Sequence, residues 1–234
     1  MYAGERPSAA SLGGLGQWSI GFSRSALADL ARVAEPTRRE SARTALFSER
    51  QQRTQIYVLG KGWACAYRDF SDGRRHVSEI YLPGDVIGLA EAWTDQCGPA
   101  VVSLTEVLIT GFECDDLRAL ARTSPEVAEG IATTLAGSVN TLMQRCAGLA
   151  RQTAYERVAA MLWSMRARLQ PHGGPQLHSF PCPVSQAVMS DALGLSAVHV
   201  NRSLRQLAQD GVLRKHSHEV EVLDNDALEG IVRV

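Results

Sequence analysis

Residues 183–207 are the stretch that most restricts what this 234-residue chain can fold into. Ser185 is a candidate N-cap for a first helix, and Gly194, a residue typical of helix ends, follows its last apolar position. Ser196 is a candidate N-cap for a second helix. The apolar positions of that second helix are Val200, Leu204 and Leu207. The spacing therefore predicts two short helices joined by a tight turn.

The outward face of the second helix is polar and cationic. It carries Val198, His199, Asn201, Arg202 and Arg205. Such a helix fits the major groove of DNA, where Arg can bridge guanine O6 and N7, Asn can pair with adenine, and a small apolar side chain can touch a thymine methyl. An ordinary helical hairpin has the same spacing, so the two helices alone leave both interpretations open.

The residues after the two helices favour the DNA-binding interpretation. Residues 212–215 are typical of a short strand, residues 216–218 of a turn, and residues 219–223 alternate polar and apolar side chains. A winged helix-turn-helix has this order of elements, with Arg214, Lys215 and His216 of the wing able to lie along phosphate.

Composition allows two domains with a substantial core, since 45% of the residues are hydrophobic and 21% are charged. A formal net charge of -1 argues against a protein that coats nucleic acid through bulk charge, but not against one whose cations gather on one helix and a wing. No apolar run approaches the roughly 20 residues of a membrane span. Residues 1–7 lack the layout of a signal peptide, so we expect a cytoplasmic protein.

The cysteines and histidines do not suggest a metal site. The five cysteines are scattered without a C-x-x-C pair, which predicts buried free thiols rather than an iron–sulfur cluster. Most of the six histidines lie on expected loops or in the wing, where solvated imidazoles are the expected state.

The N-terminal part of the chain changes character twice. Residues 1–17 are rich in Gly, Ala and Ser and predict a flexible arm, and residues 18–33 have helical spacing with Ser23 or Ser25 as a cap. From about residue 43 to residue 114, short strands alternate with turns such as 71–73 and 83–85. This pattern predicts an antiparallel β-roll of the double-stranded β-helix or jelly-roll kind, assigned to a domain at 18–122.

A long helix is predicted for residues 123–152, opened by Ser124 and Pro125. Its apolar residues recur at steps of three or four: Ile131, Leu135, Val139, Leu142, Cys146 and Leu149. The stripe is long for a lone surface helix and is typical of a parallel seam between two copies of a chain, with packing inside one chain as the open alternative. Residues 153–234, which begin with an amphipathic helix over 155–169, form the expected C-terminal domain.

Taken together, these motifs resemble the Crp/Fnr family of bacterial transcription regulators over about residues 20–228. The resemblance rests on the turn at 72–75, the segments 83–89 and 153–159, the Ser124-Pro125 helix start and the motif at 193–204. It implies an α+β fold, a cyclic-nucleotide-binding-like effector domain, and a homodimer bound to double-stranded DNA at a near-palindromic operator. It also implies RNA polymerase as a partner, activation as the commoner mode, and no enzymatic activity.

Departures from the family's pattern disfavour a cyclic nucleotide as the effector. Members that bind cyclic AMP hold the phosphate with an Arg-Ser pair, whereas no Lys or Arg occurs between Arg75 and Arg118 here. Residues 1–40 contain no Cys, unlike the oxygen-sensing members, and His76 is the only histidine before residue 170. The cofactor is unknown. An apolar effector and no effector stay open, and so does a ligand- or haem-sensing module whose DNA binding depends on an unidentified effector.

Two sets of site residues follow from the resemblance. The expected effector pocket is lined by Gly84, Val86, Gly88, Leu89, Glu91, Val102, Val139, Leu142 and Met143, with Glu91 as its one buried charge or a solvated carboxylate. The expected DNA-binding residues are Gln186, Ser196, Val198, His199, Asn201, Arg202, Arg205, Arg214 and Lys215. Arg202 aligns with the guanine-reading Arg of the family, and Val198 replaces a Glu that usually reads the opposite strand. Arg205 and Gln186 are assigned to phosphate.

Overall fold

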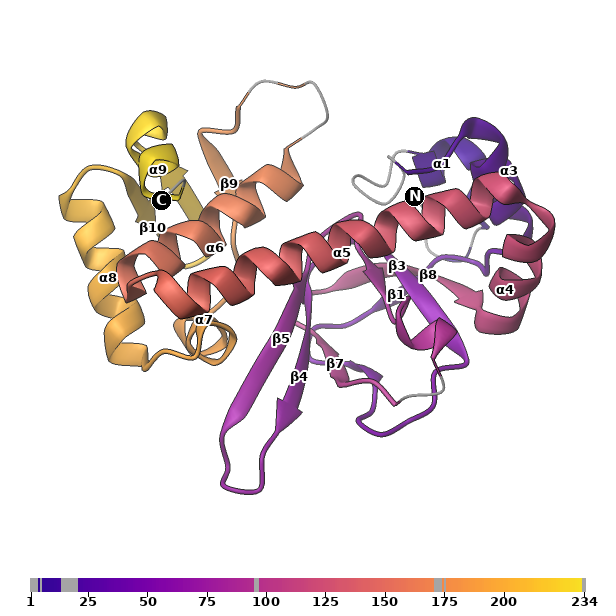
Figure 1. Ribbon diagram of the computed structural model, residues 1–234, viewed down its shortest axis with the longest axis horizontal. Helices are drawn as coiled ribbons and strands as arrows, with labels where there is room; N and C mark the ends of the chain where they lie inside the picture. The colour runs from indigo at the N-terminus through magenta and orange to yellow at the C-terminus, as the bar shows by residue number, and fades with distance from the viewer. Residues whose placement is uncertain are drawn as a thin grey trace. The chain divides into compact units, whose positions relative to one another are not determined.

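The computed structural model describes residue 4 and residues 6–13, 21–94, 97–170, 174 and 176–232. The chain divides into two compact units, one of residues 1–68 and 79–141, and one of residues 69–78 and 142–234 (Figure 1). Among the described residues, no helix has the length and apolar character that a membrane crossing needs. Each unit is described in turn.

The strands of the N-terminal region form two four-stranded sheets, which confirms the predicted antiparallel roll. One sheet has the order β1 (Arg38–Glu40), β8 (Val107–Glu113), β3 (Gln55–Lys61), β6 (Val86–Ile87). The other has the order β2 (Ala45–Phe47), β7 (Ala100–Ser103), β4 (Ala64–Asp69), β5 (Arg75–Tyr81). A short 3-10 helix, η1, spans Glu91–Trp93. Gly73 and Gly84 have φ angles of 83° and 95° in the two predicted turns, a conformation that favours glycine.

The described helices of the first unit are α1 (Ala9–Gly13), α3 (Arg24–Val33), α4 (Cys114–Thr123) and the part of α5 (Pro125–Arg151) up to residue 141. Leu12 of α1 is fully buried in one core cluster with Leu30, Phe112 and Ile131. The prediction of a flexible arm is therefore wrong for residues 6–13, because Leu12 finds an apolar surface to cover. The rest of the predicted arm, apart from residue 4, lies outside the described residues, as do residues 18–20 of the predicted helix.

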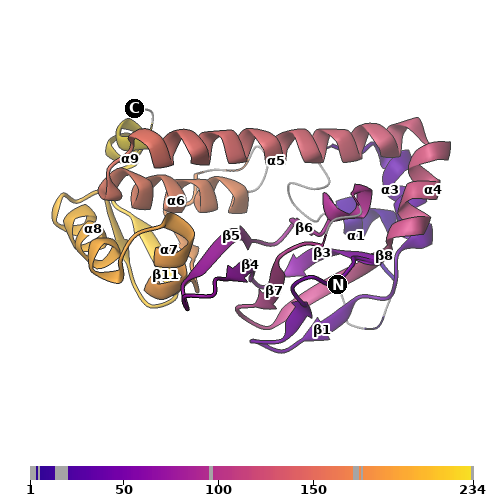
Figure 2. The same ribbon diagram turned by 60° about the horizontal axis from the view of Figure 1, so that its bottom comes forward.

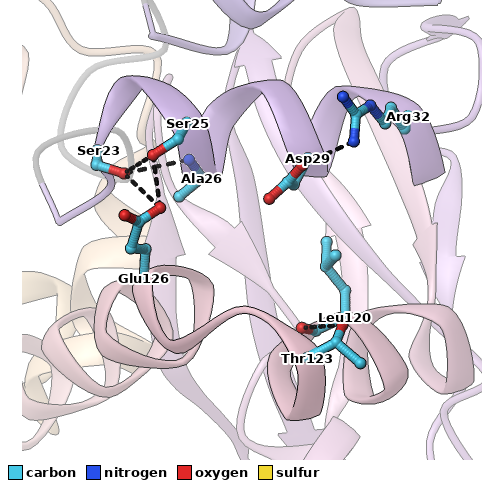
Figure 3. A network of polar contacts seen from close by, with 8 residues as sticks. All are labelled: Ser23, Ser25, Ala26, Asp29, Arg32, Leu120, Thr123 and Glu126. Atoms are coloured by element: carbon cyan, nitrogen blue, oxygen red, sulfur yellow. Dashed lines mark hydrogen bonds and ion pairs between the residues drawn. The ribbon is translucent and has the colours of Figure 1, made fainter.

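Glu126 joins the starts of α3 and α5 (Figure 3). Its Oε2 accepts hydrogen bonds from Ser25 Oγ at 2.5 Å and Ser23 Oγ at 3.4 Å. Ser23 Oγ in turn accepts from the backbone N–H of Ala26, which makes Ser23 the N-cap of α3. A carboxylate in the first turn of α5 also complements the positive end of the helix dipole. One turn later Gly130 lies against the ring of Phe22, where an added Cβ would be 2.3 Å from a ring carbon.

The second unit is built on α6 (Ala154–Leu169), which contacts both α8 (Ala197–Gln209) and α9 (Asn225–Val232) (Figure 2). Helix α7 (Gln186–Leu193) precedes α8, and a three-stranded sheet has the order β10 (Leu213–Lys215), β11 (Glu219–Val222), β9 (Ser179–Pro181). Arg166 of α6 is only 3% exposed. Its Nε donates to the carbonyl of Leu177 at 2.7 Å, and its Nη1 donates to Asn225 Oδ1 at 2.6 Å. Arg166 therefore connects α6 to the segment that precedes β9 and to the start of α9.

The turn between β10 and β11, the wing, is held by Lys215. Its Nζ donates to the carbonyl oxygens of His216 at 3.0 Å, Ser217 at 3.2 Å and Cys182 at 3.3 Å. An ammonium has three donors, so these contacts use all of them. Arg214, one residue earlier, is exposed and lies 3.7 Å from Glu221. Lys215 therefore holds the backbone of the wing, whereas Arg214 forms only an exposed ion pair.

Replacing Gly130 by Ala should destabilise the first unit by about 1–3 kcal/mol, because the new methyl group overlaps the ring of Phe22. Gly137→Ala is the matched control on the same helix. No heavy atom lies within 4 Å of its added Cβ, so the better helix propensity of Ala should stabilise by up to about 1 kcal/mol. Denaturant unfolding of both variants measures the difference. Equal free energies of unfolding would contradict the packing described here.

Replacing Lys215 by Met should lower the free energy of unfolding of the second unit by about 1–3 kcal/mol, because three carbonyls lose a charged donor. The control Arg214→Met removes only an exposed ion pair and should change stability by less than about 0.5 kcal/mol. Thermal unfolding of the two variants distinguishes the roles. A smaller loss for Lys215→Met than for Arg214→Met would show that the wing does not depend on this ammonium.

Candidate DNA-binding surface

Helix α8 exposes the polar face predicted from the sequence. Ser196 is its N-cap, accepting from the backbone N–H of His199 at 3.3 Å. The opposite side of the helix is buried, through Val200, Ser203, Leu204 and Leu207. Val198 is 66% exposed on the polar face. Arg202 and Arg205 are also exposed, and neither has a hydrogen bond or ion pair among the described residues.

Five of the predicted DNA-binding residues share one surface depression of about 590 Å³. It is lined by Gln186, Ala197, Val198, Asn201, Arg202, Arg205, Gln206 and Gln209. Free guanidinium groups, amides and one exposed methyl-bearing side chain at the same surface are the groups that can read base edges in a major groove. The sequence analysis did not predict that Gln206 and Gln209 also lie there, although their spacing from Arg202 on a helix would have shown it.

The far end of α8 is anchored to α6. Tyr155 Oη donates to Asp210 Oδ2 at 2.9 Å, and Gln206 Nε2 donates to Asp210 Oδ1 at 2.8 Å. Burial, together with the Asp210 carboxylate, raises the pKa of Tyr155 to about 12. The phenol is therefore protonated at neutral pH and donates to the carboxylate at the end of the helix.

The side chains of His199 and Asn201, in the first half of α8, each contact a neighbouring polar side chain. Ser196 Oγ lies 3.0 Å from His199 Nδ1, and Asn201 Nδ2 donates to Gln186 Oε1 at 3.1 Å. Gln186 therefore has a partner on α8. Its sequence-based assignment was a phosphate contact alone.

The wing residues differ in what they can offer to a ligand. Arg214 is exposed, and the turn residues 216–218 are exposed as well. Lys215 was predicted to lie along phosphate, but its three donors are occupied by backbone carbonyls. The interpretation of Lys215 is therefore corrected: it shapes the wing, and its charge acts on a ligand only through space.

The predicted apolar stripe of α5 is divided between two environments. Ile131 is 5% exposed and packs in the core cluster of the first unit, with Leu135 packed against that cluster. The prediction that Ile131 belongs to a seam is corrected, because α3 and the roll already cover it, whereas Leu135 is partly buried and its place in a seam stays a prediction. Val139, Leu142 and Leu149 are 55%, 60% and 56% exposed, and Cys146 is exposed too.

The residues of the expected effector pocket do not all face one space. Leu89 is 5% exposed and belongs to the core cluster, with Val86 packed against that cluster. Leu89 was expected to line a pocket, and this is corrected, since the side chain fills the core. Gly88, the residue before Leu89, has a φ of 87°. Glu91 is half-buried at the start of η1. Val102 pairs with Cys65 on β4, and Met143 is 65% exposed on α5.

Arg53 is a buried cation of the roll that the sequence analysis missed. It is 4% exposed, its guanidinium lies 4.0 Å from the centre of the Phe47 ring, and Nη1 donates to the Ser48 carbonyl at 3.3 Å while Nη2 donates to the Pro99 carbonyl. Burial lowers its pKa. The absence of Lys and Arg between residues 75 and 118 gave no sign of this cation. Arg53 precedes β3 in the sequence, and folding of the roll brings it to the carbonyl of Pro99.

Phe47 continues the stack on its other face. Its ring lies 4.7 Å from that of Tyr57, and the guanidinium of Arg38 lies 4.7 Å from the Tyr57 ring. The buried charge of this region is thus Arg53, with Glu91 contributing to its electrostatic environment, and the expectation that Glu91 would be the one buried charge is corrected.

The thiols are more varied than predicted. Cys65, Cys114 and Cys182 are buried, but Cys97 and Cys146 are exposed, and all five are free. Burial is the first cause of the raised pKa values of Cys114 and Cys182. Within the described ranges, no three His, Cys, Asp or Glu side chains come together in a group that could hold a metal ion.

Comparisons with known proteins agree with this architecture. The profile of the Crp-like helix-turn-helix domain matches residues 156–231, and that of the cyclic nucleotide-binding domain matches residues 37–124. The transcriptional activator protein FnrA of Stutzerimonas stutzeri is 22% identical over 87% of this chain and 82% of its own length. A CRP-like cAMP-activated global transcriptional regulator of Mycobacterium tuberculosis is 25% identical over 89% of this chain and 92% of its own.

A solved structure is similar to most of this chain. The structure of FixK2 from Bradyrhizobium japonicum covers 85% of this chain and 97% of its own chain, at 25% identity and a TM-score of 0.75. The cyclic nucleotide-binding profile matches the part of the chain that forms the roll, and the Crp-like helix-turn-helix profile matches the part that contains α6 to α9. The protein is a DNA-binding transcription regulator, not an enzyme, and it belongs to the Crp/Fnr family.

Proposed function

We propose that the chain acts as a homodimer whose two α8 helices bind the half-sites of a near-palindromic operator. The observation that supports this most directly is the stripe of Val139, Leu142 and Leu149 on α5, each more than half exposed in a single chain. Their spacing of three and seven residues is that of a heptad seam, with Cys146 between them. A parallel pair of helices would remove these side chains from water.

Two-fold symmetry places two copies of α8 about one helical turn of DNA apart, each facing a major groove. In this arrangement Arg202 contacts a guanine, while Val198 contacts a thymine methyl. An operator read by Val198 differs from one read by an acidic side chain at that position, because a carboxylate accepts from cytosine N4 and a valine cannot.

The regulator is proposed to contact RNA polymerase and to activate transcription, in the cytoplasm where bacterial DNA lies. Support for activation comes from the relatives, which include a transcriptional activator and a cAMP-activated regulator. These functions belong to those proteins and are carried to this chain by family membership alone.

A second candidate makes DNA binding conditional on an effector held in the roll. It is favoured by Arg53, whose Nε is buried and has no hydrogen-bond partner among the described residues. A buried guanidinium with an unmatched donor is costly, and an oxyanion would match it. Adding candidate effectors to DNA-binding measurements distinguishes a conditional regulator from one that binds DNA in its free form.

Leu142→Glu should convert the dimer into monomers, since it places two carboxylates opposite each other in the proposed seam. Gln144→Glu adds the same charge two residues along α5, at a heptad position that faces away from the seam, and should leave the dimer intact. Sedimentation equilibrium measures both. A dimeric Leu142→Glu variant, or a monomeric wild-type protein, would contradict the proposed assembly.

Arg202→Ala should cost about 1–3 kcal/mol of binding free energy per half-site and relax the preference at one base pair in each half-site. The cost arises because the bidentate contact to guanine O6 and N7 is lost. Fluorescence anisotropy on a set of duplexes with single substitutions measures it. An equal loss of affinity on every duplex would show that Arg202 contacts phosphate instead.

A further inference from the structure

Two amides from different helices meet at the reading surface. Asn201 is half-buried on α8, and Gln186 is the first, exposed residue of α7. Asn201 Nδ2 donates to Gln186 Oε1 at 3.1 Å, and both side chains line the depression that holds Arg202. This contact connects the two helices of the helix-turn-helix at the point where bases would lie.

The backbone on both sides of the contact is fixed. Ser185 caps α7 through the backbone N–H of Val188 at 3.2 Å, and Ser190 Oγ donates to the carbonyl of Gln186 at 2.8 Å. Asn201 follows Val200, which is fully buried, so its place on α8 is set by packing. With both backbones held, the Gln186 side chain reaches the Asn201 amide, and its Oε1 accepts from Nδ2 at 3.1 Å.

An Asn amide presents one acceptor and two donor hydrogens, and turning it by half a rotation exchanges them. Recognition of adenine needs Oδ1 to accept from N6 and Nδ2 to donate to N7 at the same time. Gln186 takes one Nδ2 hydrogen, which leaves Oδ1 and the second hydrogen for a base. The opposite orientation of the Asn201 amide would place Oδ1 against Oε1 unless the Gln186 amide turned with it, so the contact couples the orientations of the two amides.

We propose that Gln186 is a positioning residue that fixes the orientation of the Asn201 amide and thereby sets the base preference at one position of each half-site. This inference rests on the proposed function and replaces a purely phosphate-directed role for Gln186. Its own Nε2 hydrogens stay available to phosphate. A loss of the Asn201 contact is therefore separable from a loss of phosphate binding.

The test measures dissociation constants of the full-length protein for its selected duplex and for duplexes with each base pair substituted. Asn201→Ala should lose about tenfold of the preference at one position per half-site. Gln186→Ala should relax the same position by about threefold to tenfold, and the double variant should be no more relaxed than Asn201→Ala alone. Gln186→Glu should keep the preference, since its carboxylate still accepts from Nδ2, and should weaken binding to every duplex by charge repulsion.

Gln144→Ala is the matched control, because Gln144 is an exposed glutamine of α5 that lies outside the lining of the depression. It should leave the preference at that position unchanged, and thermal unfolding of each variant confirms that the fold is intact. Uniform weakening by Gln186→Ala on every duplex would assign Gln186 to phosphate and overturn the proposal. An unchanged preference would overturn it as well. If the wild-type protein did not distinguish sequences at all, the proposed function itself would fail.

Discussion

The burial of one side of α8 is the interaction on which the functional surface depends. Val200 and Leu207 are fully buried, and α8 contacts α6, α7 and β10. Because these contacts fix the rotation of the helix, residues on the other side are held outward whatever their chemistry. For this reason the apolar residue Val198 is 66% exposed, and the guanidinium groups of Arg202 and Arg205 form no ion pair within the part of the chain that the structure describes. These exposed side chains are therefore accessible to a bound partner.

Local signals in the sequence predicted the parts that local chemistry decides. Ser185 and Ser196 cap the two helices as expected, and Gly194 ends α7 with a φ of 61°. Strict alternation at 219–222 produced β11, paired with β10. Strand β9 and helix α9 were not predicted. Strand β9 is only three residues long and depends on its pairing with β11, a long-range contact that no local sequence pattern indicates.

Features that depend on distant residues were the ones the sequence analysis misjudged. Ile131 was assigned to a seam between copies, yet it meets Phe112 and Leu30 in its own chain. Lys215 was assigned to phosphate from its charge, yet the carbonyl of Cys182, 33 residues away, is one of its partners. Arg53 escaped notice because the carbonyl it contacts at Pro99 is brought close only by the roll. In each case the residue type indicated the kind of contact, but the sequence did not show which distant residue would be the partner.

The account's central claim is that a symmetric pair of chains presents two copies of α8 to one duplex. Native mass spectrometry of the protein on a duplex obtained by selection from random sequences tests it most directly, combined with a hydroxyl-radical footprint of the same complex. Two chains per duplex, with protected regions about one helical turn apart, are the predicted result. One chain per duplex with a single protected region would contradict it.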